Sequence, residues 1–208
     1  MSSKMDGRFY ALLLRYSQEP DRPERDGVEK VLWDEFGTQK TVMVMDMSGF
    51  SLLTQKHGIV HYLSMVRRMQ ITSEPIIESY RGQVVKFEAD NCFAMFADAL
   101  GAVQAAIALN HAFDAANVLT PDELDIRISC GIDQGKILVV DEKDYFGHAV
   151  NRASKLGEDT ASPGEILVTK TVADAIPEEA AISMDPISLT ISGIEIEGCS
   201  VKYLKQTE

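Results

Sequence analysis

Apolar positions in the first forty residues follow a helical period that is interrupted by a polar segment. Residues 17–27 (SQEPDRPERDG) contain two prolines and alternate in charge, which predicts a linker or loop. Apolar residues then recur at i, i+3, i+4 and i+8 from Val28 to Phe36, a helical stripe that Asp26 would cap and Gly37 would end. We therefore expect residues 1–40 to form an N-terminal extension that is partly helical.

From residue 41 onward, short β-branched runs alternate with longer segments of helical period. The expected strands are 41–45, 83–87, 91–96, 126–132, 136–140, 166–169, 189–191 and 200–204. The expected helices are 51–80, broken near Gly58, then 98–116 and 149–156. Strands and helices are interleaved and several strands form hairpins. This pattern predicts an α+β fold in which helices cover one face of a mostly antiparallel sheet.

The composition of the 208-residue chain is that of a globular protein, with 45% hydrophobic and 25% charged residues. This is enough apolar material for a core, and no run approaches the ~18 apolar residues of a membrane span. The N-terminus lacks a cleavage-site pattern, so we expect no secretory signal. The cysteines Cys92, Cys130 and Cys199 are widely spaced, which indicates reduced thiols in a cytoplasmic protein.

Acidic residues outnumber basic ones, 32 to 20, which gives a formal net charge of −12. A surface of this sign repels nucleic-acid backbones and anionic lipid, so we expect neither a nucleic acid nor a membrane as a partner. An anionic ligand such as a nucleotide would have to be held by local positive groups or by a metal ion.

Two aspartates end predicted strands at positions where chemistry could occur. Asp46 follows the strand 41–45, and Asp90 lies at the tip of the hairpin formed by 83–87 and 91–96. An aspartate at such a position more often shapes the turn by bonding the following backbone. If the strands are neighbours, however, the paired carboxylates could hold two hard cations and assist a phosphoryl transfer.

A second candidate site lies in the segment from Asp144 to Leu156 (DYFGHAVNRASKL). If a helix starts after Gly147, Asn151 and Lys155 are four residues apart and share one face. An amide and a cation on one face suit a ribose hydroxyl and a phosphate. An isolated pair of this kind is more commonly part of a solvated helix surface.

Five blocks, taken in order, resemble the catalytic domain of the class III nucleotidyl cyclases, the adenylyl and guanylyl cyclases. They are VMDMSGFSLL (44–53), GQVVKFEADNCFAMF (82–96), RISCGIDQGKI (127–137), DYFGHAVNRASKL (144–156) and SPGEILVT (162–169). The resemblance implies a catalytic domain over residues 41–205 with an α+β, ferredoxin-like fold. It also implies a head-to-tail homodimer with catalytic sites at the interface.

The resemblance assigns one group of residues to metal and phosphate binding. Asp46, Asp90 and the carbonyl of Met47 match the ligands of two Mg²⁺ or Mn²⁺ ions per site. The turn whose amides meet the triphosphate corresponds to Ser48, Gly49 and Phe50.

The resemblance assigns a second group to the nucleoside. Lys86 and Asp144 match the two positions that read the purine, with the identities found in adenylyl cyclases. Adenine offers a ring-nitrogen acceptor and an exocyclic amine donor, which a lysine donor and an aspartate acceptor complement. Asn151 matches the residue that orients the ribose, and Lys155 stands where the family usually has an arginine that stabilises the transition state.

Three departures from the family pattern point to lower activity. Lys155 replaces arginine, and a point-charge ammonium cannot copy a bidentate guanidinium. Ala89 replaces the usual glycine before Asp90, which is tolerated unless the turn needs a positive φ. The last hairpin, residues 191–198, lacks the lysine that usually binds the triphosphate, so Lys202 or Lys205 would have to substitute.

The sequence therefore predicts a cytoplasmic, homodimeric adenylyl cyclase that converts ATP to 3′,5′-cyclic AMP and pyrophosphate. Two alternatives stay open. The chain could be a cyclase for GTP or a pyrimidine nucleotide, because selectivity rests on two side chains, or a nucleotide-binding regulatory module with little turnover. The retention of both metal-binding aspartates and of Lys86, Asp144 and Asn151 favours the enzyme.

Overall fold

The computed structural model describes residues 4–191 and 194–203, and the side chains of residues 7–49, 54–188 and 195–203. The helices are α1 (Lys4–Gln18), α2 (Arg22–Phe36), α3 (Phe50–His57), α4 (Ile59–Ser79), α5 (Ala99–Asn117), α6 (His148–Ser154) and α7 (Lys170–Asp174), with a π-helix η2 (Lys155–Thr160) after α6. The strands are β1 (Gly37–Met47), β2 (Gly82–Glu88), β3 (Asn91–Phe96), β4 (Ile128–Val140), β5 (Asp144–Phe146), β6 (Ile166–Thr169), β7 (Ser183–Ile191) and β8 (Ile194–Lys202).

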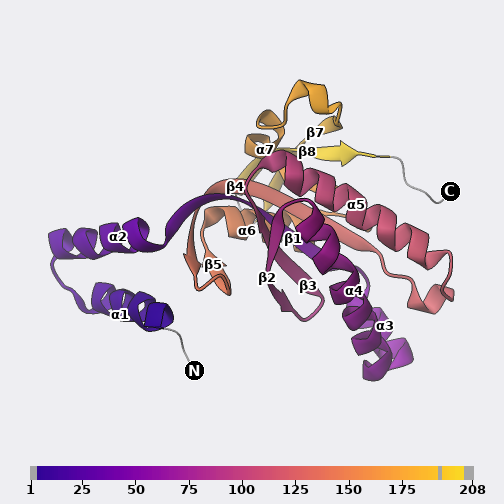
Figure 1. Ribbon diagram of the computed structural model, residues 1–208, viewed down its shortest axis with the longest axis horizontal. Helices are drawn as coiled ribbons and strands as arrows, with labels where there is room; N and C mark the ends of the chain where they lie inside the picture. The colour runs from indigo at the N-terminus through magenta and orange to yellow at the C-terminus, as the bar shows by residue number, and fades with distance from the viewer. Residues whose placement is uncertain (1–3, 192–193, 204–208) are drawn as a thin grey trace.

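The strands form one sheet in the order β2-β3-β1-β4-β6-β8-β7, with β5 paired to β4 (Figure 1). The β4–β6 pair is parallel, whereas the pairs β1–β3, β1–β4, β2–β3, β4–β5, β6–β8 and β7–β8 are antiparallel. The mixed α+β fold with a mostly antiparallel sheet is therefore confirmed.

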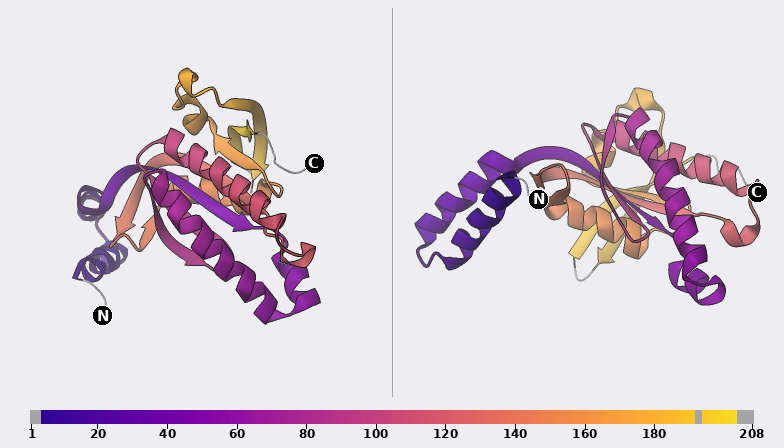
Figure 2. Two further views of the ribbon diagram at one scale, coloured as in Figure 1. Left: turned by 45° about the vertical axis from the view of Figure 1, so that its right-hand side comes forward. Right: turned by 60° about the horizontal axis from the view of Figure 1, so that its bottom comes forward.

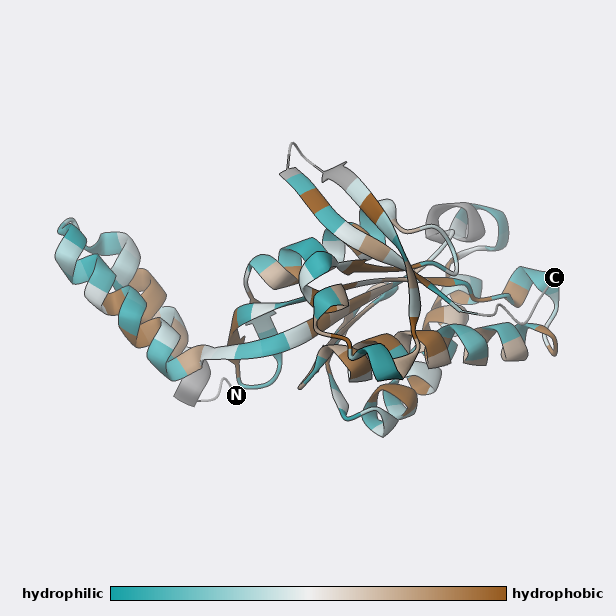
Figure 3. Cartoon of the chain, turned by 90° about the horizontal axis from the view of Figure 1, so that it is seen from above, coloured by the Kyte–Doolittle hydropathy of each residue, from teal (hydrophilic) through white to brown (hydrophobic). Residues whose placement is uncertain are grey.

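Strand β1 runs through the centre of the sheet and separates two cores. Met43, Met45 and Met47 belong to the larger core beneath α4 and α5, whereas Val42 and Val44 pack with residues of α6. Because side chains alternate along a strand, Asp46 lies on the α6 side with Val42 and Val44. Figure 3 shows the apolar residues concentrated on these central strands.

The expectation that helices cover only one face of the sheet is wrong. Helices α4 and α5 cover one face, and α6 with η2 lies against the other (Figure 2). This second layer is short, and it presents the segment that contains Asn151 and Lys155 on the same face as Asp46.

Strand β4 is continuous where the sequence predicts two strands joined at residues 133–135. Asp133 is fully buried there and accepts hydrogen bonds from Thr169 Oγ1 and Arg152 Nε, each at 2.6 Å. A buried carboxylate is tolerated when such donors surround it, so the polar residue does not mark a turn.

The N-terminal residues form a hairpin of α1 and α2 that extends beyond one end of the sheet in all three views of Figures 1 and 2. Helix α2 begins at Arg22 with Asp21 before it and a proline in its first turn, so residues 22–27 are helical and not a linker. Among the described residues, no helix combines the length and the hydropathy that crossing a membrane requires.

Candidate functional site

The structure places Asp46 and Asp90 side by side. Asp46 pairs with Asn91 across β1 and β3, and the Met47 amide donates a hydrogen bond to the Asp90 carbonyl (3.2 Å). Burial, together with the negative charges of Asp90 and Glu158, raises the pKa of Asp46 to about 7. A cation bound beside Asp46 would offset the repulsion between these carboxylates and stabilise the ionised form of Asp46.

Two residues that lie near Asp46 and Asp90 are not predicted from the sequence. Tyr62 of α4 is buried, and its pKa is raised to about 12 by burial, by the charge of Asp90 and by a hydrogen bond to it. Glu158 of η2 contributes negative charge at Asp46. Neither residue lies near the aspartates in sequence, so only the packing of α4 and η2 on the sheet reveals them.

Oxygen donors such as these carboxylates suit Mg²⁺ or Mn²⁺. The pair Asp46 and Asp90, with the Met47 carbonyl adjacent in the chain, therefore fits the predicted ion type. In the part of the chain that the structure describes, no group of three or more His, Cys, Asp or Glu side chains is arranged to hold a metal ion.

The turn after β1 leads directly into α3. Gly49 has φ +91°, a left-handed conformation that glycine adopts without a steric penalty, and α3 begins at Phe50. The Ser48 amide donates to the Arg127 carbonyl (2.9 Å), so this amide is already occupied. The amides of Gly49 and Phe50 are the remaining predicted phosphate donors, and the side chain of Phe50 lies outside the described side chains.

Lys86 and Asp144 come together from different strands. Lys86 Nζ lies 3.2 Å from Asp144 Oδ1 and 3.1 Å from Glu88 Oε2, and it stands over the Phe93 ring, 5.2 Å from its centroid. Partial burial lowers the pKa of Lys86, but the hydrogen bonds and charges of Glu88 and Asp144 outweigh it and leave this pKa raised. The ammonium is therefore held in its charged form.

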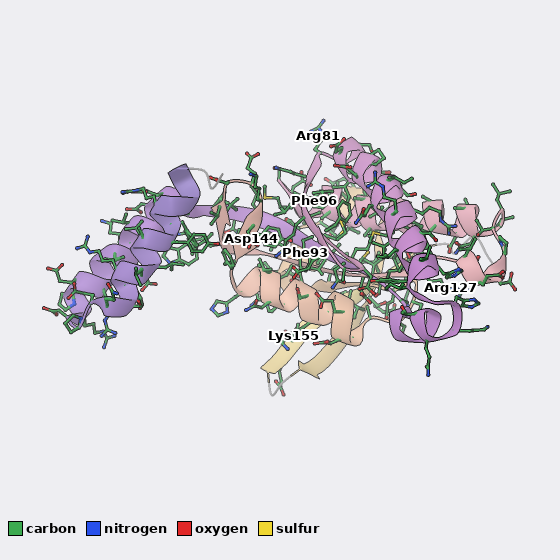
Figure 4. The ribbon with its side chains drawn as sticks, turned by 90° about the horizontal axis from the view of Figure 1, so that it is seen from below. Arg81, Phe93, Phe96, Arg127, Asp144 and Lys155 are labelled. Atoms are coloured by element: carbon green, nitrogen blue, oxygen red, sulfur yellow. The ribbon has the colours of Figure 1, made fainter. Side chains whose placement is uncertain are left out.

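The β4–β5 hairpin folds over the sheet to make this contact. Strand β5 pairs with β4, three strands from β2 in the sheet order, yet Asp144 reaches Lys86 of β2. Tyr145 is 3% exposed and packs its ring edge-on against Phe93 of β3, with centroids 6.4 Å apart. Figure 4 shows Asp144 and Phe93 in the same region of the molecule.

Two glycines bring α6 and η2 close to the sheet. A Cβ at Gly131 of β4 would lie 2.1 Å from the Ala153 carbonyl oxygen, and one at Gly157 of η2 would lie 2.6 Å from the Val44 carbonyl oxygen. The side chain of Ser129, the partner of Asp46 on β4, donates to the Gly157 carbonyl (2.9 Å). The π-helix is thereby fixed at the level of Asp46.

Asn151 is exposed on α6, and Lys155 opens η2, with its Nζ 3.9 Å from Asp159 Oδ2. Figure 4 shows Lys155 on the β7–β8 side of α6, apart from Asp144 and Phe93. One chain thus assembles the pair Asp46–Asp90 and the pair Lys86–Asp144, and it presents Asn151 and Lys155 on a separate segment.

Of the two lysines predicted to replace the triphosphate-binding lysine, the structure describes only Lys202. Lys202 Nζ is paired with Asp185 Oδ2 at 2.8 Å, and Lys205 lies outside the described residues, as do Ser192 and Gly193 of the last hairpin. Arg127 is exposed, and its carbonyl is bonded to the Ser48 amide. No described residue forms an ion pair with its guanidinium.

Comparison with known proteins identifies the family. The model of the adenylate and guanylate cyclase catalytic domain matches residues 37–195. The protein named "Putative adenylate cyclase 3" of Rhizobium meliloti (strain 1021) is 30% identical over 128 residues, which are 62% of this chain and 22% of that protein. "Uncharacterized protein Rv2212" of Mycobacterium tuberculosis (strain H37Rv) is 26% identical over 144 residues, 69% of this chain and 36% of that protein. The chain thus spans well under half the length of these relatives.

Solved structures agree with this match. An adenylate/guanylate cyclase/hydrolase from Silicibacter pomeroyi has a TM-score of 0.66 at 27% identity, covering 79% of this chain and 96% of that one. The adenylyl cyclase CyaB from P. aeruginosa shares the fold, with a TM-score of 0.68 at 21% identity over 82% of this chain and 97% of that one. The chain therefore belongs to the adenylate and guanylate cyclase catalytic domain family, the class III nucleotidyl cyclases.

Proposed function

We propose that this protein is an adenylyl cyclase that converts ATP to 3′,5′-cyclic AMP and pyrophosphate. In this reaction the ribose 3′-oxygen attacks the α-phosphorus in line, and the proton of the 3′-hydroxyl passes to solvent. The bond from that phosphorus to the bridging oxygen of the β-phosphate breaks, and pyrophosphate leaves. The observation that carries the proposal is the contact of Lys86 Nζ with Asp144 Oδ1 at 3.2 Å.

This pair has donor and acceptor positions left for adenine. The Lys86 ammonium carries three N–H donors, and contacts with Glu88 and Asp144 leave one for a ring nitrogen. Asp144 Oδ1 also accepts from the Tyr145 amide (2.9 Å), which leaves Oδ2 for the exocyclic amine. In the same pose, guanine would place an N–H donor where adenine has the ring-nitrogen acceptor, and an oxygen acceptor where adenine has the amine. The Lys86 ammonium would then face a donor and the Asp144 carboxylate an acceptor, and neither would be paired.

Asp46, Asp90 and the Met47 carbonyl would hold Mg²⁺ or Mn²⁺ in this proposal. When bound, such ions lower the pKa of the attacking hydroxyl and neutralise phosphate charge. The residues of α6 and η2 would act on the rest of the substrate. Asn151 would orient the ribose, and the Lys155 ammonium would stabilise negative charge that develops at the α-phosphate.

We also infer that the working unit is a homodimer in which each site combines the metal-binding aspartates of one chain with the base readers of the other. That second chain would also supply Asn151 and Lys155 to the nucleotide. Membership of the cyclase catalytic-domain family supports this arrangement.

The first experiment is incubation of the purified protein with Mn²⁺ and each of ATP, GTP, CTP and UTP, with products identified by mass. We expect cyclic AMP from ATP, and no product from the Asp46→Ala variant. A different cyclic nucleotide would overturn the assignment of Lys86 and Asp144 as adenine readers, and no product from any nucleotide would favour a binding module.

A matched pair of lysine variants tests the assignment of the base readers. Lys86→Ala removes the proposed reader, whereas Lys170→Ala removes an exposed lysine that is paired with Asp174 on α7. We expect only Lys86→Ala to lower the preference for ATP over GTP, by about tenfold or more. An unchanged preference in Lys86→Ala would contradict the proposal.

A further inference from the structure

Phe9 of α1 is buried against the strand that carries Asp144. It is 2% exposed although the hairpin of α1 and α2 extends away from the sheet. Its ring lies edge-on to Phe36 of α2, with centroids 5.1 Å apart. It also stacks nearly parallel on Phe146 of β5, with centroids 5.8 Å apart and an angle of 11° between the rings.

Strand β5 has little support of its own. It contains three residues and pairs with β4 through Leu138, Val139 and Val140. The turn between β4 and β5 places Asp141 at φ +50° and Glu142 at φ +57°, conformations that cost energy for residues other than glycine. Outside the pairing with β4, a hydrogen bond from Gln83 Nε2 to Glu142 Oε2 (3.2 Å) ties this turn to β2, so few hydrogen bonds fix the position of β5.

Side-chain packing holds β5 from two sides. Tyr145 points inward and packs on Phe93, and Phe146 packs on Phe9. Because alternate residues of a strand face opposite sides, Asp144 and Phe146 share one side of β5. A shift of Phe146 would therefore move Asp144, whose pairing with Lys86 depends on a 3.2 Å contact. Recognition groups of this kind lose most of their effect when they are displaced by about 1 Å.

We propose that Phe9 is a positioning residue for base selection. The N-terminal hairpin is part of the recognition site, because the stack of Phe9 on Phe146 holds β5 where Asp144 pairs with Lys86. This inference rests on the proposed function in one respect, namely that Lys86 and Asp144 read the purine. It adds a specificity role for a helix that lies outside the segment matched by the family model.

The neighbouring aromatic residue supplies a matched control. Tyr10 lies on the same helix, is 54% exposed and meets the Phe9 ring edge-on, with centroids 5.5 Å apart. Tyr10→Ala therefore removes one aromatic contact of Phe9 but keeps both rings of the Phe9–Phe146 stack. We expect Phe9→Ala to lower the ratio of kcat/KM for ATP to that for GTP by about tenfold, mainly through a higher KM for ATP. Tyr10→Ala should leave this ratio within about twofold of the wild type. An unchanged ratio in folded Phe9→Ala protein would overturn the proposal.

A double-mutant cycle separates positioning from general destabilisation. If Phe9 acts through Phe146, the selectivity loss in Phe9→Ala/Phe146→Ala will equal that of either single variant, whereas independent effects will multiply. Multiplying effects would contradict the proposed route. Should Phe9→Ala fail to fold, Phe9→Leu keeps much of the buried volume, and we expect it to show a smaller loss in the same direction.

A second readout does not depend on turnover. Acylation of Lys86 by acetic anhydride, followed by peptide mass spectrometry, reports how firmly its ammonium is held by Asp144 and Glu88. We expect faster acylation of Lys86 in Phe9→Ala than in Tyr10→Ala, with Lys170 as the internal reference. If the wild type forms no cyclic product, the proposed function fails, but this rate still decides the positioning role. Equal rates would refute it.

Discussion

Ala89 has φ +52° in the turn between β2 and β3, directly before Asp90. A left-handed conformation costs an L-residue about 1–2 kcal/mol, whereas glycine adopts it freely but loses more entropy on folding. We therefore expect Ala89→Gly to raise the free energy of unfolding by up to about 1 kcal/mol, measured by urea denaturation. Ala97→Gly, an exposed alanine without positive φ, should lower it. The prediction is wrong if both substitutions destabilise the protein.

Asp46 makes the stability of the metal-free protein depend on pH. Its pKa rises to about 7 in the fold because of burial and the charges of Asp90 and Glu158, while the unfolded chain keeps the ordinary value near 4. The folded state then binds more protons than the unfolded state between these values. The contribution of Asp46 to stability is thus full below about pH 4 and is lost as the pH rises through 7.

The corresponding measurement is urea denaturation at pH 5 and pH 8 without metal. We expect Asp46→Asn to lose less stability between these pH values than the wild type, because its amide does not ionise. Asp174→Asn, which removes an exposed carboxylate, serves as the control. Mn²⁺ should raise the melting temperature of the wild type more at pH 8 than at pH 6, because protons compete for Asp46. Equal pH dependence in wild type and Asp46→Asn would contradict the assignment.

Arg127 offers a positive group for the triphosphate where the last hairpin lacks a lysine in its described part. It is exposed beside the Ser48 turn, in a protein of net charge −12 that needs local cations to hold an anion. We expect Arg127→Ala to raise both the KM for ATP and the inhibition constant of pyrophosphate by about tenfold, the value of one charge-assisted hydrogen bond. Arg67→Ala, an exposed arginine of α4, should change neither. Unaltered pyrophosphate inhibition in Arg127→Ala would rule the role out.

At the scale of elements, the contact of α6 and η2 with the sheet depends on Gly131. A Cβ there would collide with the Ala153 carbonyl oxygen at 2.1 Å. We expect Gly131→Ala to lower the free energy of unfolding by about 3 kcal/mol and to reduce kcat, because the helix that carries Asn151 must move.

Gly27→Ala in α2 is the matched control for this substitution. Its Cβ would meet no atom within 4 Å, and alanine favours a helix over glycine, so we expect a gain of about 0.5–1 kcal/mol. Denaturation curves and cyclase assays on both variants provide the measurements. Retention of wild-type stability in Gly131→Ala would show that α6 is not held as closely as the clearance indicates.

The elements also show what the sequence could predict. The helix that the apolar pattern predicts over residues 98–116 agrees with α5 to within one residue at each end. In the structure Asp98 is the N-cap of this helix and accepts a hydrogen bond from the Gly101 amide (2.8 Å). The continuity of strand β4 is not predictable in this way, because the burial of Asp133 depends on Thr169 and Arg152, which are distant in sequence. For the same reason, local sequence patterns do not place Tyr62 and Glu158 beside the two aspartates. Local patterns specify elements and their ends, whereas partners across the fold decide which polar residues are buried.

At the scale of the whole molecule, the candidate site is distributed over surfaces that face solvent in one chain. Lys86 and Asp144 form an ion pair on the β2 side of the sheet. Asp46 and Asp90 lie where β1 meets the β2–β3 turn, and Lys155 lies on η2. A nucleotide held by all of these groups would be enclosed only if a second surface closed over it. The homodimer inferred above supplies such a surface, and mixing inactive variants tests it directly.

With ATP as substrate, Asp46→Ala should be inactive alone and Lys86→Ala should keep only a small fraction of wild-type activity. In the proposed dimer, each site combines the aspartates of one chain with the base readers of the other. In an equal mixture that exchanges subunits, half of the dimers are mixed, and each mixed dimer has one intact site of two. We therefore expect about a quarter of wild-type activity in the mixture, by the symmetry of a two-fold dimer. Asp46→Ala mixed with Asp90→Ala should recover none, because every site then lacks an aspartate. Recovery in neither mixture would show that one chain supplies all of these residues to a site. Recovery in both would show that the two aspartates of a site come from different chains, so that the chains do not pair as proposed.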